Sequence, residues 1–168
     1  MPRRLLARCR PDSILEFRAA AVQRYEDGLA AAAADRRLAA IYLWGYSAEM
    51  ALKAAYFTLI GVGDNVPLTM PGDIRPAIDR GRFLGVPWPR AGEGHNVQAW
   101  AGLLVLERAA LPGRAYRPDF ARDVQAYGQQ AGSLWNETLR YHANVAYSHE
   151  VRQVREATEW FLVNHEAL

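Results

Sequence analysis

The sequence contains very little cysteine and lysine, and its net charge is small. Cys9 is the only cysteine among 168 residues, so the chain cannot form an internal disulfide or a thiolate metal cluster. Lys53 is the only lysine, against nineteen arginines. The formal net charge of +2 neither requires nor excludes nucleic acid as a partner. Arginine in such excess favours bidentate contact with phosphate or carboxylate groups wherever it is exposed.

The sequence also lacks the common catalytic and targeting motifs. It has no phosphate-binding glycine loop, no nucleophile elbow and no H-E-x-x-H metal motif. We therefore expect neither a cofactor nor a metal site. Residues 1–12 are basic but lack the apolar core of a signal peptide, so we expect a poorly ordered arm on a cytoplasmic protein.

The longest apolar stretch, residues 39–60, carries Glu49 and Lys53 near its middle. It is long enough to cross a bilayer, which takes about 20 residues. Each ionised residue near the middle of a span costs roughly 2.5 to 3.5 kcal/mol, so we predict no membrane span. A helix that is apolar on most of its surface is buried, which predicts the central helix of a bundle. One narrow stripe of that helix carries its polar side chains: Tyr42, Tyr46, Glu49, Lys53 and Tyr56.

Apolar residues at helical spacing predict an all-α, up-and-down bundle of about five helices in a single domain, residues 13–168. Ser13 and Glu16 form a capping-box pattern before a helix over residues 14–33. On that helix Leu15, Val22 and Leu29 recur every seven residues, with Ile14, Ala21 and Gly28 beside them. Later helices are expected from about His95 to Leu111, from Pro118 to Thr138, and from Glu150 to His165.

Residues 61–94 hold seven of the thirteen glycines and five of the nine prolines. Such a composition predicts a long loop with at most a short helix, near residues 73–83. Loops of this length in a compact domain are usually functional or disordered. The loop is therefore either a partner-binding segment or a solvated insertion over the core.

Three short motifs, in order, resemble those of HEPN domains (higher eukaryotes and prokaryotes nucleotide-binding). Glu49-Met50-Ala51-Leu52-Lys53 resembles the E-x-x-L-K signature, and Gly94-His95-Asn96-Val97 resembles the G-H-D-L start of the third family helix. Trp135 to Tyr141 is similar to the W-x-x-x-L-R-Y close of the fourth helix. The resemblance covers about residues 13–164 and implies an all-α bundle that usually forms a homodimer.

The resemblance implies several functions. Many HEPN proteins are metal-independent RNases of toxin–antitoxin or defence systems. Others lack catalysis and bind nucleotides or act with a nucleotidyltransferase. The RNases carry an arginine, then four to six other residues, then a histidine. Here Arg140 is followed by His142 after one residue and by His149 after eight, so neither histidine has that spacing.

The candidate site residues are therefore Arg140, His142 and His149 for catalysis, and Glu49, Lys53 and Arg140 for ligand binding. In one interpretation Glu49 orients Arg140 toward a phosphate; in the other, Glu49 and Lys53 form a structural ion pair, which matters most if buried. We expect an accessory or binding protein for nucleic acid, a nucleotide or a nucleotidyltransferase. The alternatives are a metal-independent endoribonuclease toxin with an antitoxin partner, and a dimeric scaffold.

Overall fold

The computed structural model describes residues 11–89, 94–111 and 117–168. Within these ranges the chain is helical and contains no strand, which confirms the all-α prediction. The helices number six in this part of the chain, one more than predicted: α1 (Ile14–Ala33), α2 (Arg37–Leu59), α3 (Arg75–Phe83), α4 (Val97–Ala110), α5 (Pro118–Gly132) and α6 (Ser148–Val163). A π-helical turn (Met70–Ile74) leads into α3, and a 3₁₀ helix (Glu137–Tyr141) lies between α5 and α6. The N-terminal arm falls mostly outside the described residues.

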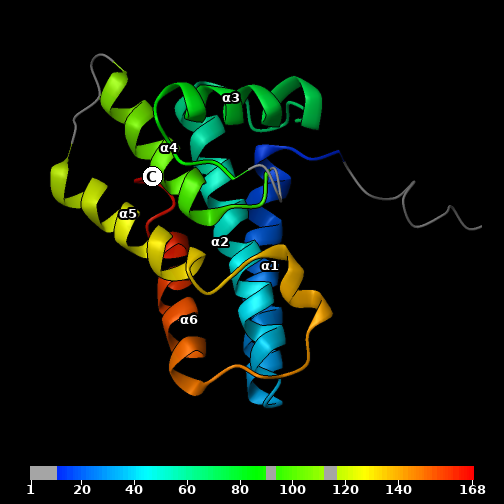
Figure 1. Cartoon of the computed structure of the whole chain (residues 1–168). Coiled ribbons are helices and arrows are strands. Elements are labelled where there is room, and N and C mark those ends of the chain that lie inside the picture. The colour runs from blue at the N-terminus through cyan, green and yellow to red at the C-terminus, as the bar shows by residue number, and fades with distance from the viewer. Residues whose placement is uncertain (1–10, 90–93, 112–116) are drawn as a thin grey trace, which may run out of the picture.

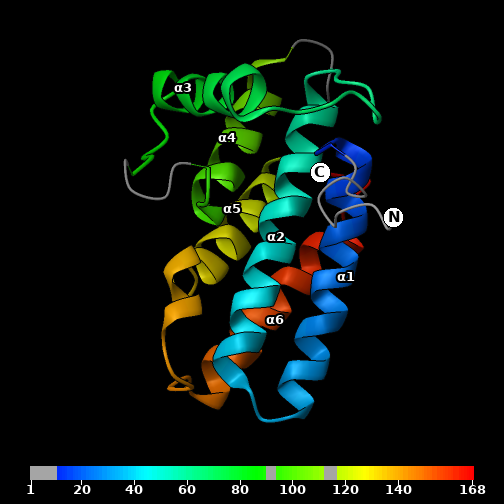
Figure 2. The same cartoon turned by 90° about the vertical axis from the view of Figure 1, so that its right-hand side faces the viewer.

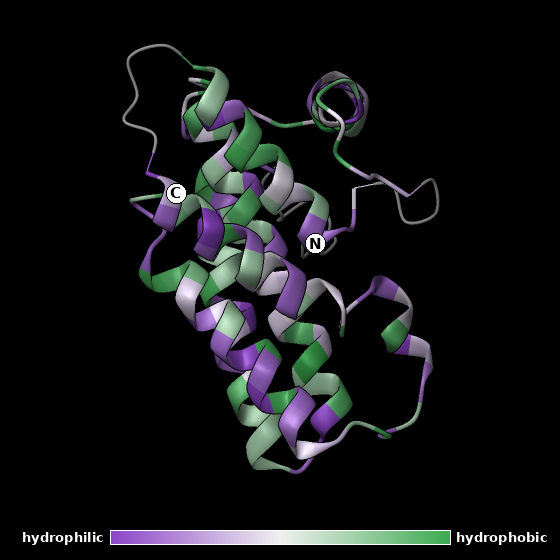
Figure 3. Ribbon diagram, turned by 60° about the vertical axis from the view of Figure 1, so that its left-hand side comes forward, coloured by the Kyte–Doolittle hydropathy of each residue, from purple (hydrophilic) through white to green (hydrophobic). Residues whose placement is uncertain are grey.

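Helix α2 is the centre of the bundle. It runs antiparallel to α1, and α6 and α4 pack on its other sides (Figures 1 and 2). Leu52 and Ala48 are fully buried, and most of the α2 circumference is covered by neighbours. The outer helices carry hydrophobic and hydrophilic residues together, as Figure 3 shows. No helix in the described ranges is long and apolar enough to cross a membrane.

The face of α1 that is buried is not the face that carries its largest hydrophobic side chains. Ser13 Oγ accepts from the Glu16 amide at 3.2 Å, and the helix occupies the predicted residues. Buried positions are Ile14, Ala21 and Gly28, whereas Leu15, Val22 and Leu29 are exposed. The reason is close packing of helix on helix. A Cβ at Gly28 would overlap the indole of Trp44, so small residues let α1 approach α2.

The fourth predicted helix, from Pro118 to Thr138, is longer than the observed helix. Helix α5 ends at Gly132, and Leu134 and Thr138 do not continue it. After the break Trp135 is buried and its Nε1 donates to the Tyr42 carbonyl at 3.0 Å. The Asn136 side chain then caps the 3₁₀ helix by accepting from the Thr138 amide at 2.9 Å. The chain therefore leaves the helical conformation, although its apolar periodicity continues, because Trp135 packs its indole against α2.

The glycine- and proline-rich segment is only partly a loop. Its predicted short helix is present as the π-helical turn and α3, which cross the end of the bundle near the top of Figure 1. The loop before them is held to the start of α1. The Leu15 amide donates to the Asp64 carbonyl at 3.0 Å, and the Leu68 amide donates to the Asp12 carbonyl at 2.7 Å.

Replacing Leu52 with alanine should lower the free energy of unfolding by about 2 to 5 kcal/mol, because truncating a fully buried leucine leaves a cavity. The matched control is Leu15→Ala. Leu15 belongs to the hydrophobic repeat but is 42% exposed, so its loss should stay below about 1 kcal/mol. Chemical denaturation followed by circular dichroism measures both. Equal losses would show that α1 buries the other stripe.

Candidate functional site

A broad groove of about 860 Å³ lies between α1, α2, the π-helical turn and the start of α4. Small-molecule sites commonly measure about 300 to 1,000 Å³, so the groove suits a ligand of that class. Its lining mixes apolar and charged side chains: Asp12, Glu16, Phe17, Ala20, Gln23, Arg24, Tyr46, Glu49, Met50, Lys53, Leu68, Met70, Ile74, Gly94 and His95.

Three ionisable side chains meet in the wall of the groove. Lys53 Nζ lies 2.5 Å from Glu49 Oε1, and His95 Nδ1 lies 3.1 and 3.2 Å from the two Glu49 oxygens. Glu49 is 2% exposed and Lys53 is 7% exposed. Burying a charge is unfavourable unless it is paired and hydrogen-bonded, and both conditions hold here. Glu49 and Lys53 are therefore a buried ion pair that also holds a histidine.

The backbone before α4 explains why His95 reaches Glu49. Gly94 has a φ of 92°, a left-handed conformation that glycine adopts easily, and its carbonyl accepts from Trp100 Nε1 at 3.0 Å. On the other side Asn96 caps α4 by accepting from the Ala99 amide at 2.7 Å. The turn that carries His95 is thus held at both ends.

The His95 ring is oriented as well as anchored. It packs edge-to-face on Tyr46, with centroids 5.7 Å apart and planes at 75°. Its Nδ1 faces the buried Glu49 carboxylate, and the side chain, which is 40% exposed, lines the groove. Within the described residues nothing is hydrogen-bonded to Nε2. A ligand in the groove would meet this nitrogen.

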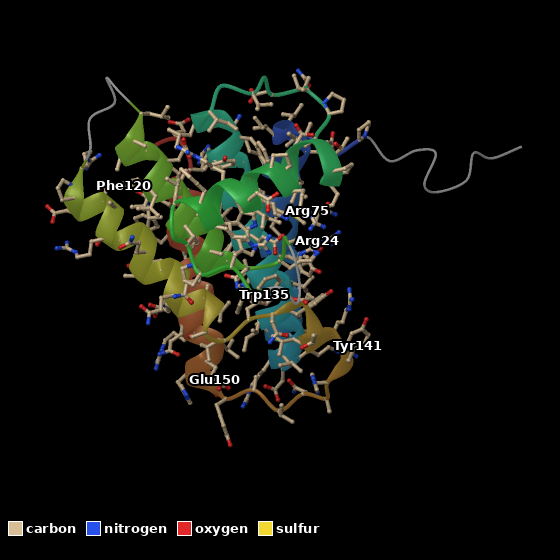
Figure 4. The ribbon with its side chains drawn as sticks, turned by 45° about the horizontal axis from the view of Figure 1, so that its top comes forward. Arg24, Arg75, Phe120, Trp135, Tyr141 and Glu150 are labelled. Atoms are coloured by element: carbon tan, nitrogen blue, oxygen red, sulfur yellow. The ribbon has the colours of Figure 1, made fainter. Side chains whose placement is uncertain are left out.

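Arg140 lies elsewhere, in a separate hollow of about 390 Å³. This hollow is lined by Arg36, Leu38, Ala39, Tyr42, Leu139, Arg140, His142 and Asn144. Hydrogen bonds to Tyr42 and Tyr141 raise the pKa of Arg140 above its ordinary value. Its guanidinium also lies 4.8 Å from the centre of the Tyr141 ring. Figure 4 shows Tyr141 on the 3₁₀ helix, away from Arg24 beside the groove.

Among the described residues, no hydrogen bond or ion pair joins Glu49 to Arg140, so no direct contact supports the interpretation in which Glu49 orients Arg140. The Glu49 oxygens are occupied by Lys53 and His95, and tyrosines hold Arg140. Tyr42 and Tyr46 stand between the two regions, ring edge to ring face, with centroids 5.0 Å apart. Burial is the main cause that raises the pKa of Tyr46, followed by its hydrogen bond to Tyr42.

The three catalytic candidates are only partly brought together. Arg140 and His142 line the same hollow. His149 lies in the first turn of α6, where its ring stacks on Tyr147 with centroids 5.8 Å apart. Asn144 shapes the hollow: its Nδ2 donates to the Asp35 carbonyl at 2.9 Å, and its Oδ1 accepts from the Leu38 amide at 2.9 Å.

His95 is the residue that the sequence interpretation missed. In the sequence it stands out only as part of the motif that begins a helix. A histidine between a glycine and a helix-capping asparagine is a signal that it sits in a defined turn. Its carboxylate partner is 46 residues away, and only the fold brings the two together.

Comparison with known proteins adds no relative: no family model, no curated protein and no solved structure matches this chain. The resemblance to HEPN domains therefore rests on its motifs alone. Within the described ranges, no three His, Cys, Asp or Glu side chains lie close enough together to hold a metal ion. The chemistry of the groove is thus that of a paired carboxylate, an ammonium group and an imidazole.

Proposed function

We propose that the protein is a HEPN-like nucleotide-binding module whose site is the groove over Glu49, Lys53 and His95. The observation that supports this proposal is the mixed lining of the groove. Phe17, Met50 and Met70 offer apolar surface, whereas Arg24 and His95 offer nitrogen atoms. A nucleotide needs both kinds of group, because its flat base packs on apolar and aromatic side chains and its phosphate accepts hydrogen bonds.

The acidic residues of the groove suit the remaining part of a nucleotide. Asp12 lies at the groove, and a carboxylate commonly accepts hydrogen bonds from ribose hydroxyls. Arg24 Nη1 donates to Asp27 Oδ2 at 2.6 Å, which leaves its other N–H groups for a ligand. The Glu49–Lys53 pair is neutral in sum and forms part of the groove wall. In this function the groove binds the nucleotide and does not alter it chemically.

Binding is tested by isothermal titration calorimetry with AMP, GMP, CMP and UMP, and with adenosine and inorganic phosphate as partial ligands. Arg24→Ala should weaken binding about tenfold or more, because a hydrogen bond to a charged group contributes about 1.5 to 3 kcal/mol. Arg140→Ala should leave affinity unchanged. Both arginines are surface-accessible, so neither substitution should unfold the protein. A thermal melt of each variant checks this.

The reverse result, loss with Arg140→Ala and no effect of Arg24→Ala, would move the site to the second hollow. No binding of any nucleotide would refute the proposal.

A second candidate function is a metal-independent endoribonuclease of a toxin–antitoxin or defence system. The observation that favours it is that Arg140 and His142 line one hollow. Chelator-resistant RNA cleavage that disappears in Arg140→Ala would support it. If the protein neither binds a nucleotide nor cleaves RNA, a role as a dimeric scaffold is favoured.

Partners follow from the resemblance and remain proposals. They are a second copy of the chain, a nucleotidyltransferase or antitoxin, and RNA in place of a free nucleotide. The exposed apolar stripe of α1 is a surface on which a second copy would pack: Leu15, Val22 and Leu29.

A further inference from the structure

We propose that His95 binds the phosphate group of the ligand through Nε2 as an imidazolium, so that binding a phosphate dianion above neutral pH brings a proton into the groove. This inference rests on the proposed function. It adds the atom that meets the phosphate and the protonation state in which it does so.

The contact with Glu49 determines which ring nitrogen carries hydrogen. His95 Nδ1 lies within 3.2 Å of both carboxylate oxygens, and the Glu49 carboxylate is paired with the Lys53 ammonium. An ionised carboxylate only accepts hydrogen bonds, so Nδ1 must be the donor. In the neutral ring Nε2 then bears a lone pair and no hydrogen.

The oxygens of a phosphate dianion only accept hydrogen bonds, so none of them can bond to Nε2 of the neutral ring. The two lone pairs would face each other. Only the doubly protonated ring has a second N–H, at Nε2, to donate. The orientation of His95 by Glu49 therefore makes protonation a condition for a direct phosphate bond. When the phosphate binds, solvent or buffer supplies one proton to Nε2. No covalent bond to phosphorus forms or breaks.

Charged and titratable side chains surround His95. From α2 it faces Glu49, Lys53 and the Tyr46 phenol. Among the described residues, three acidic and two basic side chains line the groove. The acidic and basic lining residues are Asp12, Glu16, Arg24, Glu49 and Lys53. On the nearby π-helical turn, the Asp73 carboxylate accepts from the Thr69 amide at 2.7 Å.

Proton uptake is measured by titrating AMP into the protein at pH 8 in several buffers that differ in ionisation enthalpy. At this pH the AMP phosphate is a dianion. The slope of the observed enthalpy against buffer enthalpy should correspond to about one proton taken up per AMP bound. Affinity for AMP should fall about tenfold per pH unit over the range in which uptake is complete.

Two controls separate the phosphate contact from other sources of protons. Adenosine, which lacks phosphate, should bind without proton uptake. His95→Gln supplies an amide N–H that needs no proton, so AMP should bind it with no uptake and with an affinity that is flat with pH. Circular dichroism confirms that this variant folds.

Several outcomes overturn the inference. AMP binding to the wild-type protein without proton uptake would refute it while leaving the proposed function in place. Undiminished uptake in His95→Gln would assign the proton to another group and refute it too. No AMP binding in any buffer would refute the proposed function, and with it this inference.

Discussion

Replacing Glu49 with alanine should lower the free energy of unfolding by about 3 to 5 kcal/mol, because it leaves a buried ammonium without its carboxylate. Lys53 is 7% exposed, and within the described residues its only ion-pair partner is Glu49, 2.5 Å away. The aromatic ring of Trp100, 5.5 Å from Nζ, compensates only part of that loss. Urea denaturation followed by tryptophan fluorescence measures the change.

Matched variants show whether the loss comes from the charge. Lys53→Met should be less harmful, because Glu49 keeps His95 as a partner. The double variant Glu49→Leu, Lys53→Met should recover much of the stability, since an apolar replacement of a whole buried pair is often neutral. A loss below about 1 kcal/mol in Glu49→Ala would mean that water reaches Lys53, and it would contradict the buried pair.

Replacing Trp100 with alanine should cost about 3 to 5 kcal/mol of stability, because it removes a large, fully buried ring. Trp100 packs edge-to-face on Trp88, with centroids 5.1 Å apart, and lies against Tyr56 and Phe57. The same residue holds the Gly94 carbonyl, and so the turn that carries His95. We therefore expect a loss of nucleotide affinity beyond the loss of stability.

The control for the second effect is Trp100→Phe. Phenylalanine keeps most of the ring packing but has no N–H for the Gly94 carbonyl. Its stability loss should be smaller than that of Trp100→Ala, while binding of AMP should still weaken. Calorimetry of the folded variant, below its melting temperature, separates the two. If Trp100→Phe binds AMP as the wild type does, the turn is held by other contacts.

The helices with strong local signals were predicted well. Helix α1 begins and ends at the predicted residues, because Ser13 caps it and its interior lacks glycine until the last turns. Helix α6 and the short α3 were placed to within two residues or so. Helix α5 is shorter than predicted. The apolar periodicity of the sequence continues past Gly132, but the chain turns there so that Trp135 packs inward.

The candidate site was predictable only in part. Glu49 and Lys53 attract notice because charges are rare in so apolar a stretch, and both are buried together. Their link to His95 could not be derived, since the two residues are 46 positions apart. Glu49 and Arg140 make no direct contact, because Lys53 and His95 bind Glu49 while Tyr42 and Tyr141 bind Arg140.

Local sequence patterns are sufficient to predict the helical class, the start of α1 and the burial of α2, because capping and hydrophobic periodicity act between residues a few positions apart. Which stripe of α1 is buried depends on helix packing, since Gly28 and not Leu29 allows Trp44 to approach. Helix packing also brings His95 to Glu49 and places Arg140 in another hollow. Those contacts join distant segments, and only packing of whole helices selects which distant side chains meet.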